Sequence, residues 1–131
     1  MFSSAGIAET YLEDLNIDIR LANEIVEERA SYYSHFYPKV DMVVGDIMSQ
    51  GVYETYIKKA KALSPKFLLA TPPCQGMSSL GKKAYEEDQR NYLIFAVLKV
   101  IDELDLDVIA IENVPKFLKL FFPFEGNYMG I

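Results

Sequence analysis

Short apolar runs alternate with longer amphipathic stretches along this chain. Runs of about four to eight apolar residues are typical of strands, whereas apolar side chains three or four positions apart are typical of helices. The clearest helical stretch places Leu93, Val97, Leu98 and Ile101 on one face. The pattern predicts helices at 5–15, 26–36, 53–63 and 91–104, strands at 18–23, 41–47, 66–71 and 107–114, with the last two strands buried, and a very short strand that ends at Met1 and Phe2.

The alternation of strands and helices predicts an α/β fold with a doubly wound, mainly parallel sheet. In such sheets a ligand binds outside the carboxyl ends of the strands. The residues that directly follow the apolar runs therefore form a candidate site, although they are far apart in the sequence. They are residues 3–6, Glu24, Asp46, residues 72–75 and residues 112–114.

Composition limits the class of protein. The 131 residues suit one compact domain, and half of them are hydrophobic. With 19 acidic and 13 basic residues, the net charge of −6 does not favour nucleic-acid binding unless a basic surface is local or lies on another chain. A single cysteine, no signal peptide and no apolar run long enough for a membrane helix are typical of a cytoplasmic protein without membrane contact.

The only cysteine, Cys74, follows Pro72 and Pro73 at the end of a predicted strand. Prolines fix φ and extend the residue before them, so this loop should be stiff and should present the thiol. A lone cysteine is more often a small apolar filler, but this context favours a nucleophile. A cysteine hydrolase normally uses a histidine base, and the one histidine, His35, lies in a predicted helix, so hydrolysis is disfavoured.

A second candidate, Glu112, directly follows the last predicted apolar run and precedes Asn113. An acid at a strand end is often only a solvated side chain. A partly desolvated carboxyl in the same crevice as Cys74 would instead share or donate a proton. A nucleophilic thiol with a proton donor and no histidine suits addition to an electron-poor ring, where the acid supports charge at a ring nitrogen.

The first predicted turn carries small residues, among them Ser3 and Gly6, which let backbone N–H groups approach a ligand. Glu24 follows about 20 residues later, where an acid commonly binds ribose hydroxyls, and Asp46 is placed to meet an adenine amino group. The turn lacks the full Gly-x-Gly-x-x-Gly spacing, so a nicotinamide oxidoreductase is disfavoured. No metal site is expected.

In motif order and spacing, nearly the whole chain resembles the DNA cytosine-5 methyltransferases. Pro-Pro-Cys-Gln and Glu-Asn-Val at this separation are the most specific of the shared motifs. The resemblance is carried by FSSAGIAE at 2–9, ANEI at 22–25, GDI at 45–47, TPPCQGMSSLGK at 71–82, DQRNYLIFAVLKVI at 88–101 and ENVPKF at 112–117.

The resemblance implies a Rossmann-like fold that binds S-adenosyl-L-methionine and methylates carbon 5 of a cytosine flipped out of double-stranded DNA. It implies that Cys74 adds to carbon 6 of the ring, that Glu112 protonates nitrogen 3, and that Asn113 orders the nucleophile loop. Phe2 and Ile25 would pack on adenine, and Leu93 would close the site. The whole cofactor pocket implied in this way is lined by Phe2, Glu24, Ile25, Asp46, Ile47, Pro73 and Leu93.

The chain departs from the family pattern at both ends. Its first strand is almost absent, and Ser4 and Ile7 stand where the family has glycines. After the apolar stretch 118–124 it lacks the family's Gln-x-Arg-x-Arg strand, target-recognition region and closing cofactor motifs. We therefore expect residues 1–131 to form a single partial catalytic domain that is inactive alone.

Three explanations for such a chain stay open. It is one subunit of a split methyltransferase of a restriction–modification system, an amino-terminal piece of one, or a non-catalytic cofactor-binding or assembly module. The first two need a second subunit or the missing carboxyl-terminal half for target recognition. The apolar stretch 118–124 would form a partner or homo-oligomer contact, or would simply complete the core.

Overall fold

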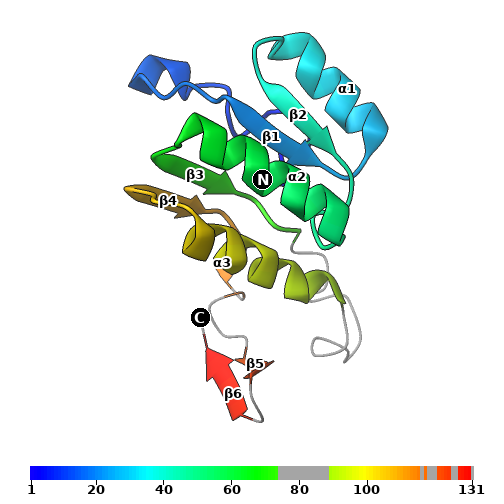
Figure 1. Cartoon of the computed structure of the whole chain (residues 1–131), viewed down its shortest axis with the longest axis vertical. Helices are drawn as coiled ribbons and strands as arrows, with labels where there is room; N and C mark the ends of the chain where they lie inside the picture. The colour runs from blue at the N-terminus through cyan, green and yellow to red at the C-terminus, as the bar shows by residue number, and fades with distance from the viewer. Residues whose placement is uncertain (74–88, 116, 118–120, 125–126, 131) are drawn as a thin grey trace.

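The computed structural model describes residues 1–73, 89–115, 117, 121–124 and 127–130. Cys74 lies outside the described residues, and so do the side chains of the predicted apolar patch 118–124. In chain order the elements are η1 (Glu13–Leu15), β1 (Leu21–Glu24), α1 (Glu27–Phe36), β2 (Asp41–Val44), α2 (Gln50–Leu63), β3 (Phe67–Ala70), η3 (Gln89–Tyr92), α3 (Leu93–Glu103), β4 (Val108–Ile111), β5 (Phe121–Phe124) and β6 (Asn127–Gly130) (Figure 1).

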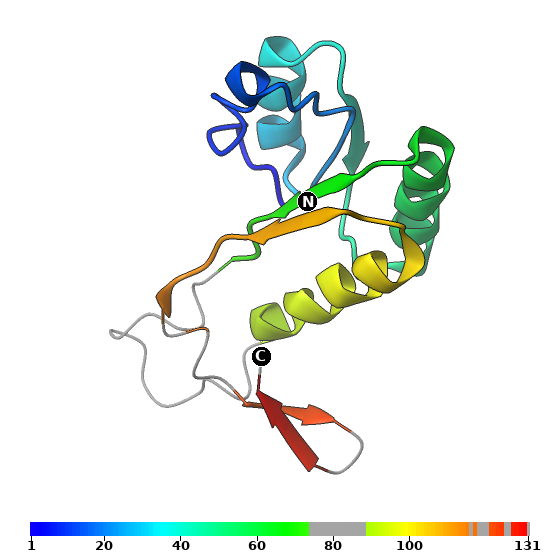
Figure 2. The same cartoon turned by 90° about the vertical axis from the view of Figure 1, so that its left-hand side faces the viewer.

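Two pairs of parallel strands form the body of the fold. β1 pairs with β2, with Asn23 opposite Val43, and β3 pairs with β4, with Leu69 opposite Ala110. α1 connects the first pair and α3 the second, whereas β5 and β6 form an antiparallel hairpin. Figure 2 shows α1 and α2 on opposite sides of β2. The predicted α/β class with parallel pairing is confirmed.

Residues 1–3 connect the two strand pairs. The Met1 ammonium donates to the Leu69 carbonyl at 2.7 Å, and the Thr71 N–H donates to the Met1 carbonyl at 3.3 Å. On the other side, the Ser3 N–H donates to the Asn23 carbonyl of β1 at 3.0 Å. This segment therefore lies between β1 and β3, but the predicted strand at Met1 and Phe2 is wrong, because residues 1–3 belong to no strand of the structure.

One core joins the helices α2 and α3 to the strands. α3 contributes Ile94, Val97 and Val100, which recur at helical spacing and are almost completely buried. Burial of such apolar side chains is the main favourable contribution to folding. The buried core residues are Met1, Val43, Ile47, Tyr53, Tyr56, Ile57, Ala60, Leu68, Ala70, Ile94, Ala96, Val97, Val100 and Phe117.

The predicted helix at 5–15 is wrong. The segment forms a series of turns and only one short helical turn, η1. Gly6 has a φ of +83°, which a right-handed helix does not accept, and the Thr10 hydroxyl donates to the Ile7 carbonyl at 2.9 Å. The Tyr37 hydroxyl also donates to the Gly6 carbonyl at 2.9 Å and holds it away from a helical partner.

The predicted helices at 26–36, 53–63 and 91–104 and the predicted strands at 18–23, 41–47, 66–71 and 107–114 are confirmed, with boundaries that shift by at most three residues. The prediction that the strand at 107–114 is buried is wrong, because Val108 is 55% exposed and Ile109 and Ile111 are also exposed. β4 pairs with a strand on one edge only within the described part of the chain. The apolar side chains of β4 are therefore not covered by the described residues.

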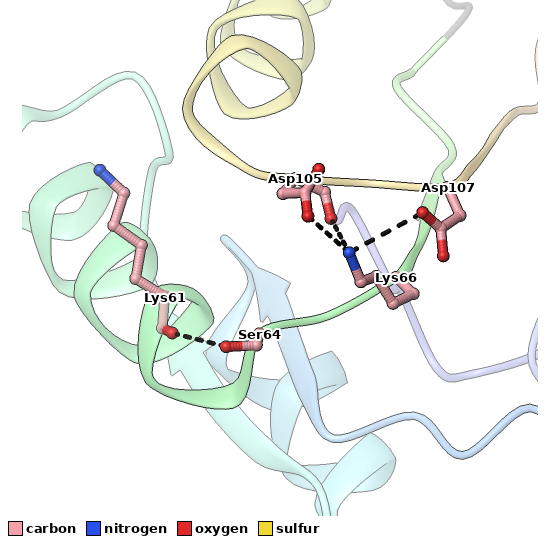
Figure 3. Close-up of polar contacts among 5 residues, drawn as sticks. All are labelled: Lys61, Ser64, Lys66, Asp105 and Asp107. Atoms are coloured by element: carbon pink, nitrogen blue, oxygen red, sulfur yellow. Dashed lines mark hydrogen bonds and ion pairs between the residues drawn. The ribbon is translucent and has the colours of Figure 1, made fainter.

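Ion pairs connect the residues that precede β3 and β4. Figure 3 shows Lys66 between Asp105 and Asp107, with its Nζ 2.6 Å from Asp105 Oδ2 and 3.8 Å from Asp107 Oδ1. The hydrogen bond from Lys66 lowers the pKa of Asp105 below its usual value. Nearby, the Ser64 hydroxyl donates to the Lys61 carbonyl where α2 ends. These groups are exposed, so they contribute little to stability, but they mark the edge opposite the predicted site.

Gly6 gives a test of this part of the fold. A Cβ at Gly6 would lie 2.4 Å from Tyr37 Cε2, on a backbone already at positive φ. We expect Gly6→Ala to lower the free energy of unfolding by about 2–3 kcal/mol through strain and overlap. Urea unfolding followed by circular dichroism measures this change.

The matched control is Gly51→Ala in α2, where an added Cβ has no neighbour within 4 Å. This change should raise the free energy of unfolding by about 0.5 kcal/mol, because alanine is a better helix former than glycine. Equal effects of the two substitutions would contradict the constraint at Gly6.

Candidate functional site

Hydrogen bonds join the loops that follow the strands. Each bond connects two loops that are at least 20 residues apart in the sequence, so the loops meet at one edge of the strands. The bonds are Ser4 N–H to Glu24 Oε2 at 2.8 Å, Gly45 N–H to the Glu24 carbonyl at 2.9 Å, Thr71 Oγ1 to the Phe2 carbonyl at 2.9 Å, and Asn113 Nδ2 to the Pro72 carbonyl at 3.0 Å.

Glu24 is the buried acid of this edge, with only 4% of its surface exposed. Its Oε2 accepts the Ser4 N–H, and its Oε1 accepts the Val26 N–H at 2.9 Å. Two charge-assisted bonds from backbone amides compensate the cost of burying the carboxylate. A carboxylate has about four acceptor positions, so these bonds leave capacity for a ligand's hydroxyl groups.

The loop after β2 carries a second acid, Asp46, whose side chain is exposed. Its Oδ1 accepts the Met48 N–H at 2.9 Å, which fixes the carboxylate at the turn. Ile25 is 60% exposed and offers an apolar surface at the end of β1. Ile47, predicted to line the same pocket, is buried in the core and borders a cavity of about 470 Å³ beside Phe95.

The first loop is held from within. Ser3 is buried, and its hydroxyl donates to the Asn23 carbonyl at 3.1 Å, so this hydroxyl supports the loop. Phe2 and Ser4 both have positive φ values, of 58° and 50°. Glycine adopts such left-handed backbone more readily than serine does, so the conformation at Ser4 costs some strain. Gly6 packs against the Tyr37 ring.

The predicted catalytic residues are only partly described. Cys74 lies outside the described residues, so its position relative to Glu112 stays a prediction. Glu112 is exposed, which favours the solvated strand-end acid over the partly desolvated proton donor. Asn113 bridges its own loop and Pro72, two residues before the cysteine, and its Oδ1 accepts the Val114 N–H at 2.8 Å. Pro73 and Leu93, which are predicted to line the cofactor pocket, are both half-buried.

Asn23 is not among the predicted site residues, yet its side chain donates to two carbonyls at the end of the neighbouring strand. The available signal was a polar residue inside an otherwise apolar strand, directly before the acid of ANEI.

A buried acid also lies outside the predicted site. Burial raises the pKa of Glu9, and burial together with the charge of Glu9 raises the pKa of Tyr33. Glu9 borders a cavity of about 360 Å³ with Leu21, Leu68 and Leu106, at the amino ends of the strands. This cavity is therefore on the opposite edge from the joined loops.

Within the described ranges, no group of three or more His, Cys, Asp or Glu side chains is placed to hold a metal ion. No helix in the described part of the chain is both long and apolar enough to cross a membrane.

Comparison with known proteins places the chain in a family. Residues 1–121 match the family described as C-5 cytosine-specific DNA methylase. The chain is 45% identical over 124 residues to the Type II methyltransferase M1.HgaI of Avibacterium volantium, a match that covers 92% of this chain and 35% of that protein. It is 40% identical over 57 residues to the Type II methyltransferase M1.BsuMI of Bacillus subtilis strain 168, covering 44% of this chain and 13% of that protein.

The chain thus spans about a third or less of the length of these relatives. No solved structure shows significant similarity to it. Because the family match extends over residues 1–121 of 131, this chain belongs to the C-5 cytosine-specific DNA methylase family.

Proposed function

We propose that this chain is the cofactor-binding and nucleophile-bearing part of a DNA cytosine-5 methyltransferase. One observation carries the proposal in addition to family membership. The buried Glu24 carboxylate bonds the first loop to the end of β1, at the edge where the described loops after the strands meet. Such an acid, held rigidly at a strand end, is the group that binds ribose in related sites.

The strand order supports a Rossmann-like, doubly wound sheet. β1 and β2 lie on one side of residues 1–3, and β3 and β4 lie on the other, so the order reverses between residues 1–3 and β3. Helices α1 and α2 lie on opposite sides of β2 (Figure 2). Ligands of doubly wound sheets bind at such a reversal, and the joined loops are found there.

The described loops fit S-adenosyl-L-methionine. Glu24 offers acceptors for ribose hydroxyls, and the exposed Asp46 carboxylate offers an acceptor for the adenine amino group. The exposed Ile25 side chain offers an apolar surface for the adenine ring. When bound, S-adenosyl-L-methionine would supply an electrophilic methyl group, because that group is attached to a positively charged sulfur.

The chemistry needs a thiolate and an acid. The Cys74 thiolate adds to carbon 6 of a flipped cytosine while Glu112 protonates nitrogen 3, so electron density moves to carbon 5. After carbon 5 is methylated, a base removes its proton, the thiolate leaves carbon 6, and Glu112 regains its proton from nitrogen 3. The bond from Asn113 to Pro72 supports this arrangement, because it connects the acid loop to the nucleophile loop.

The complete activity extends beyond this chain. We infer double-stranded DNA as the substrate and the cytoplasm as the location. The M1.HgaI relative is named a Type II methyltransferase, which supports a role in a restriction–modification system. A second subunit or a carboxyl-terminal half would supply target recognition, and the chain alone would be inactive. The exposure of Glu112 favours one alternative, a non-catalytic cofactor-binding or assembly module.

Titration calorimetry with S-adenosyl-L-homocysteine tests the pocket. We expect the chain to bind this product, and we expect Glu24→Gln to weaken binding by about 10- to 100-fold, because a charged acceptor for the ribose is lost. Glu28→Gln on the exposed surface of α1 is the control and should change the dissociation constant by less than about twofold. Unchanged binding by Glu24→Gln would remove its assignment to the ribose.

Covalent trapping tests the catalytic roles. In a chimera, this chain replaces the matching 35% of M1.HgaI, and the chimera is incubated with cofactor and DNA that contains 5-fluorocytosine. Fluorine at carbon 5 prevents the final proton loss, so we expect a stable protein–DNA adduct on denaturing gels. Cys74→Ser should give no adduct, and Glu112→Gln should slow its formation by about 100-fold or more.

Glu54→Gln, an exposed residue of α2, is the control and should form the adduct at the unchanged rate. An adduct that persists in Cys74→Ser would refute the nucleophile. A chimera that binds S-adenosyl-L-homocysteine but forms no adduct would favour the non-catalytic module.

A further inference from the structure

Asn23 is a polar side chain buried within β1, with only 2% of its surface exposed. Its amide Nδ2 donates to the Val43 carbonyl and to the Gly45 carbonyl, each at 3.0 Å. Its own backbone carbonyl accepts two bonds from Ser3, from the N–H at 3.0 Å and from Oγ at 3.1 Å. Asn23 therefore connects the first loop, β1 and the end of β2.

The turn after β2 is tightly constrained at Gly45. Gly45 has a φ of +132°, and a Cβ there would lie 2.8 Å from Val52 Cγ2. The Gly45 N–H donates to the Glu24 carbonyl at 2.9 Å, and its carbonyl accepts the Asn23 amide. The next residue is Asp46, so these two bonds fix the backbone from which its carboxylate projects.

We infer that Asn23 is a positioning residue for recognition of the adenosine part of the cofactor. It holds Ser3 on one side and Gly45 on the other, and in this way it sets the spacing between Glu24 and Asp46. This inference rests on the proposed function, in which Glu24 accepts from the ribose and Asp46 from the adenine amino group. Asn23 itself is buried and acts only through these neighbours.

The side-chain chemistry explains why an asparagine suits this place. A primary amide carries two N–H donors on one planar nitrogen, which matches two carbonyl oxygens of one strand end. Leucine has nearly the same shape without donors, so Asn23→Leu retains the volume and removes both bonds. Glu24 keeps its bonds from the Ser4 and Val26 amides in this variant, whereas the turn that carries Asp46 loses the bond from the Asn23 amide and keeps only the one from the Gly45 N–H to the Glu24 carbonyl.

The test compares two ligands of this chain by titration calorimetry. S-adenosyl-L-homocysteine carries the adenine amino group, and S-inosyl-L-homocysteine carries a carbonyl oxygen in its place. Wild-type protein should bind the inosyl compound about 30-fold more weakly, because a charge-assisted hydrogen bond to Asp46 is lost. In Asn23→Leu this ratio should fall to about threefold or less, because Asp46 no longer meets the purine.

Val100→Ala is the control for a general loss of stability, because Val100 is buried in α3 and far in the sequence from these loops. It should leave the 30-fold ratio unchanged. Circular dichroism at the temperature of the titration establishes that each variant is folded. If Asn23→Leu does not fold, Asn23→Ser is measured in the same way, since its hydroxyl donates at most one bond.

The outcomes separate the inference from the proposed function. An unchanged ratio in a folded Asn23 variant overturns the positioning role, and so does a wild-type protein that binds both ligands equally. A wild-type protein that binds no S-adenosyl-L-homocysteine overturns the proposed function together with this inference.

Discussion

The fold depends on the hydrogen bonds that residues 1–3 make to both of their neighbours. Two strands alone make a marginal sheet in water, so neither parallel pair is expected to be stable independently. Met1 bonds to Leu69 and Thr71 of one pair, and Ser3 bonds to Asn23 of the other. These three residues thus connect the two parallel pairs, and they place the first loop between them.

The position of the candidate site follows from that constraint. The first loop begins between β1 and β3. Its backbone amides therefore reach the end of β1, where Glu24 accepts the Ser4 N–H. The same junction extends to β2 through Asn23 and to the loop after β3 through the bond from Thr71 to Phe2. A ligand at this edge would therefore meet groups that the backbone already holds, with little ordering needed on binding.

The sequence predicts most of the elements because the spacing of apolar residues matches the face that each element buries. In α2 and α3 the buried residues recur at helical spacing. The prediction fails at 5–15, where the helical spacing of apolar residues is overridden by the positive φ of Gly6 and its bond from Tyr37, a residue distant in the sequence. The acids Glu24 and Asp46 were predictable from their places at strand ends. The two hydrogen bonds that the Asn23 side chain donates were not predictable, because they depend on the register of β1 against β2.

The charges of the described residues do not favour DNA binding by this part of the chain. Several of its cations are already paired: Lys59 with Asp41, Lys61 with Glu103 and Lys66 with Asp105. A net charge of −6 repels phosphates, and each phosphate contact needs a cation that can replace a counterion. Under the proposed function, this chain therefore contributes the cofactor-binding site and the nucleophile. The positive surface that attracts DNA would come from other segments or from a partner chain.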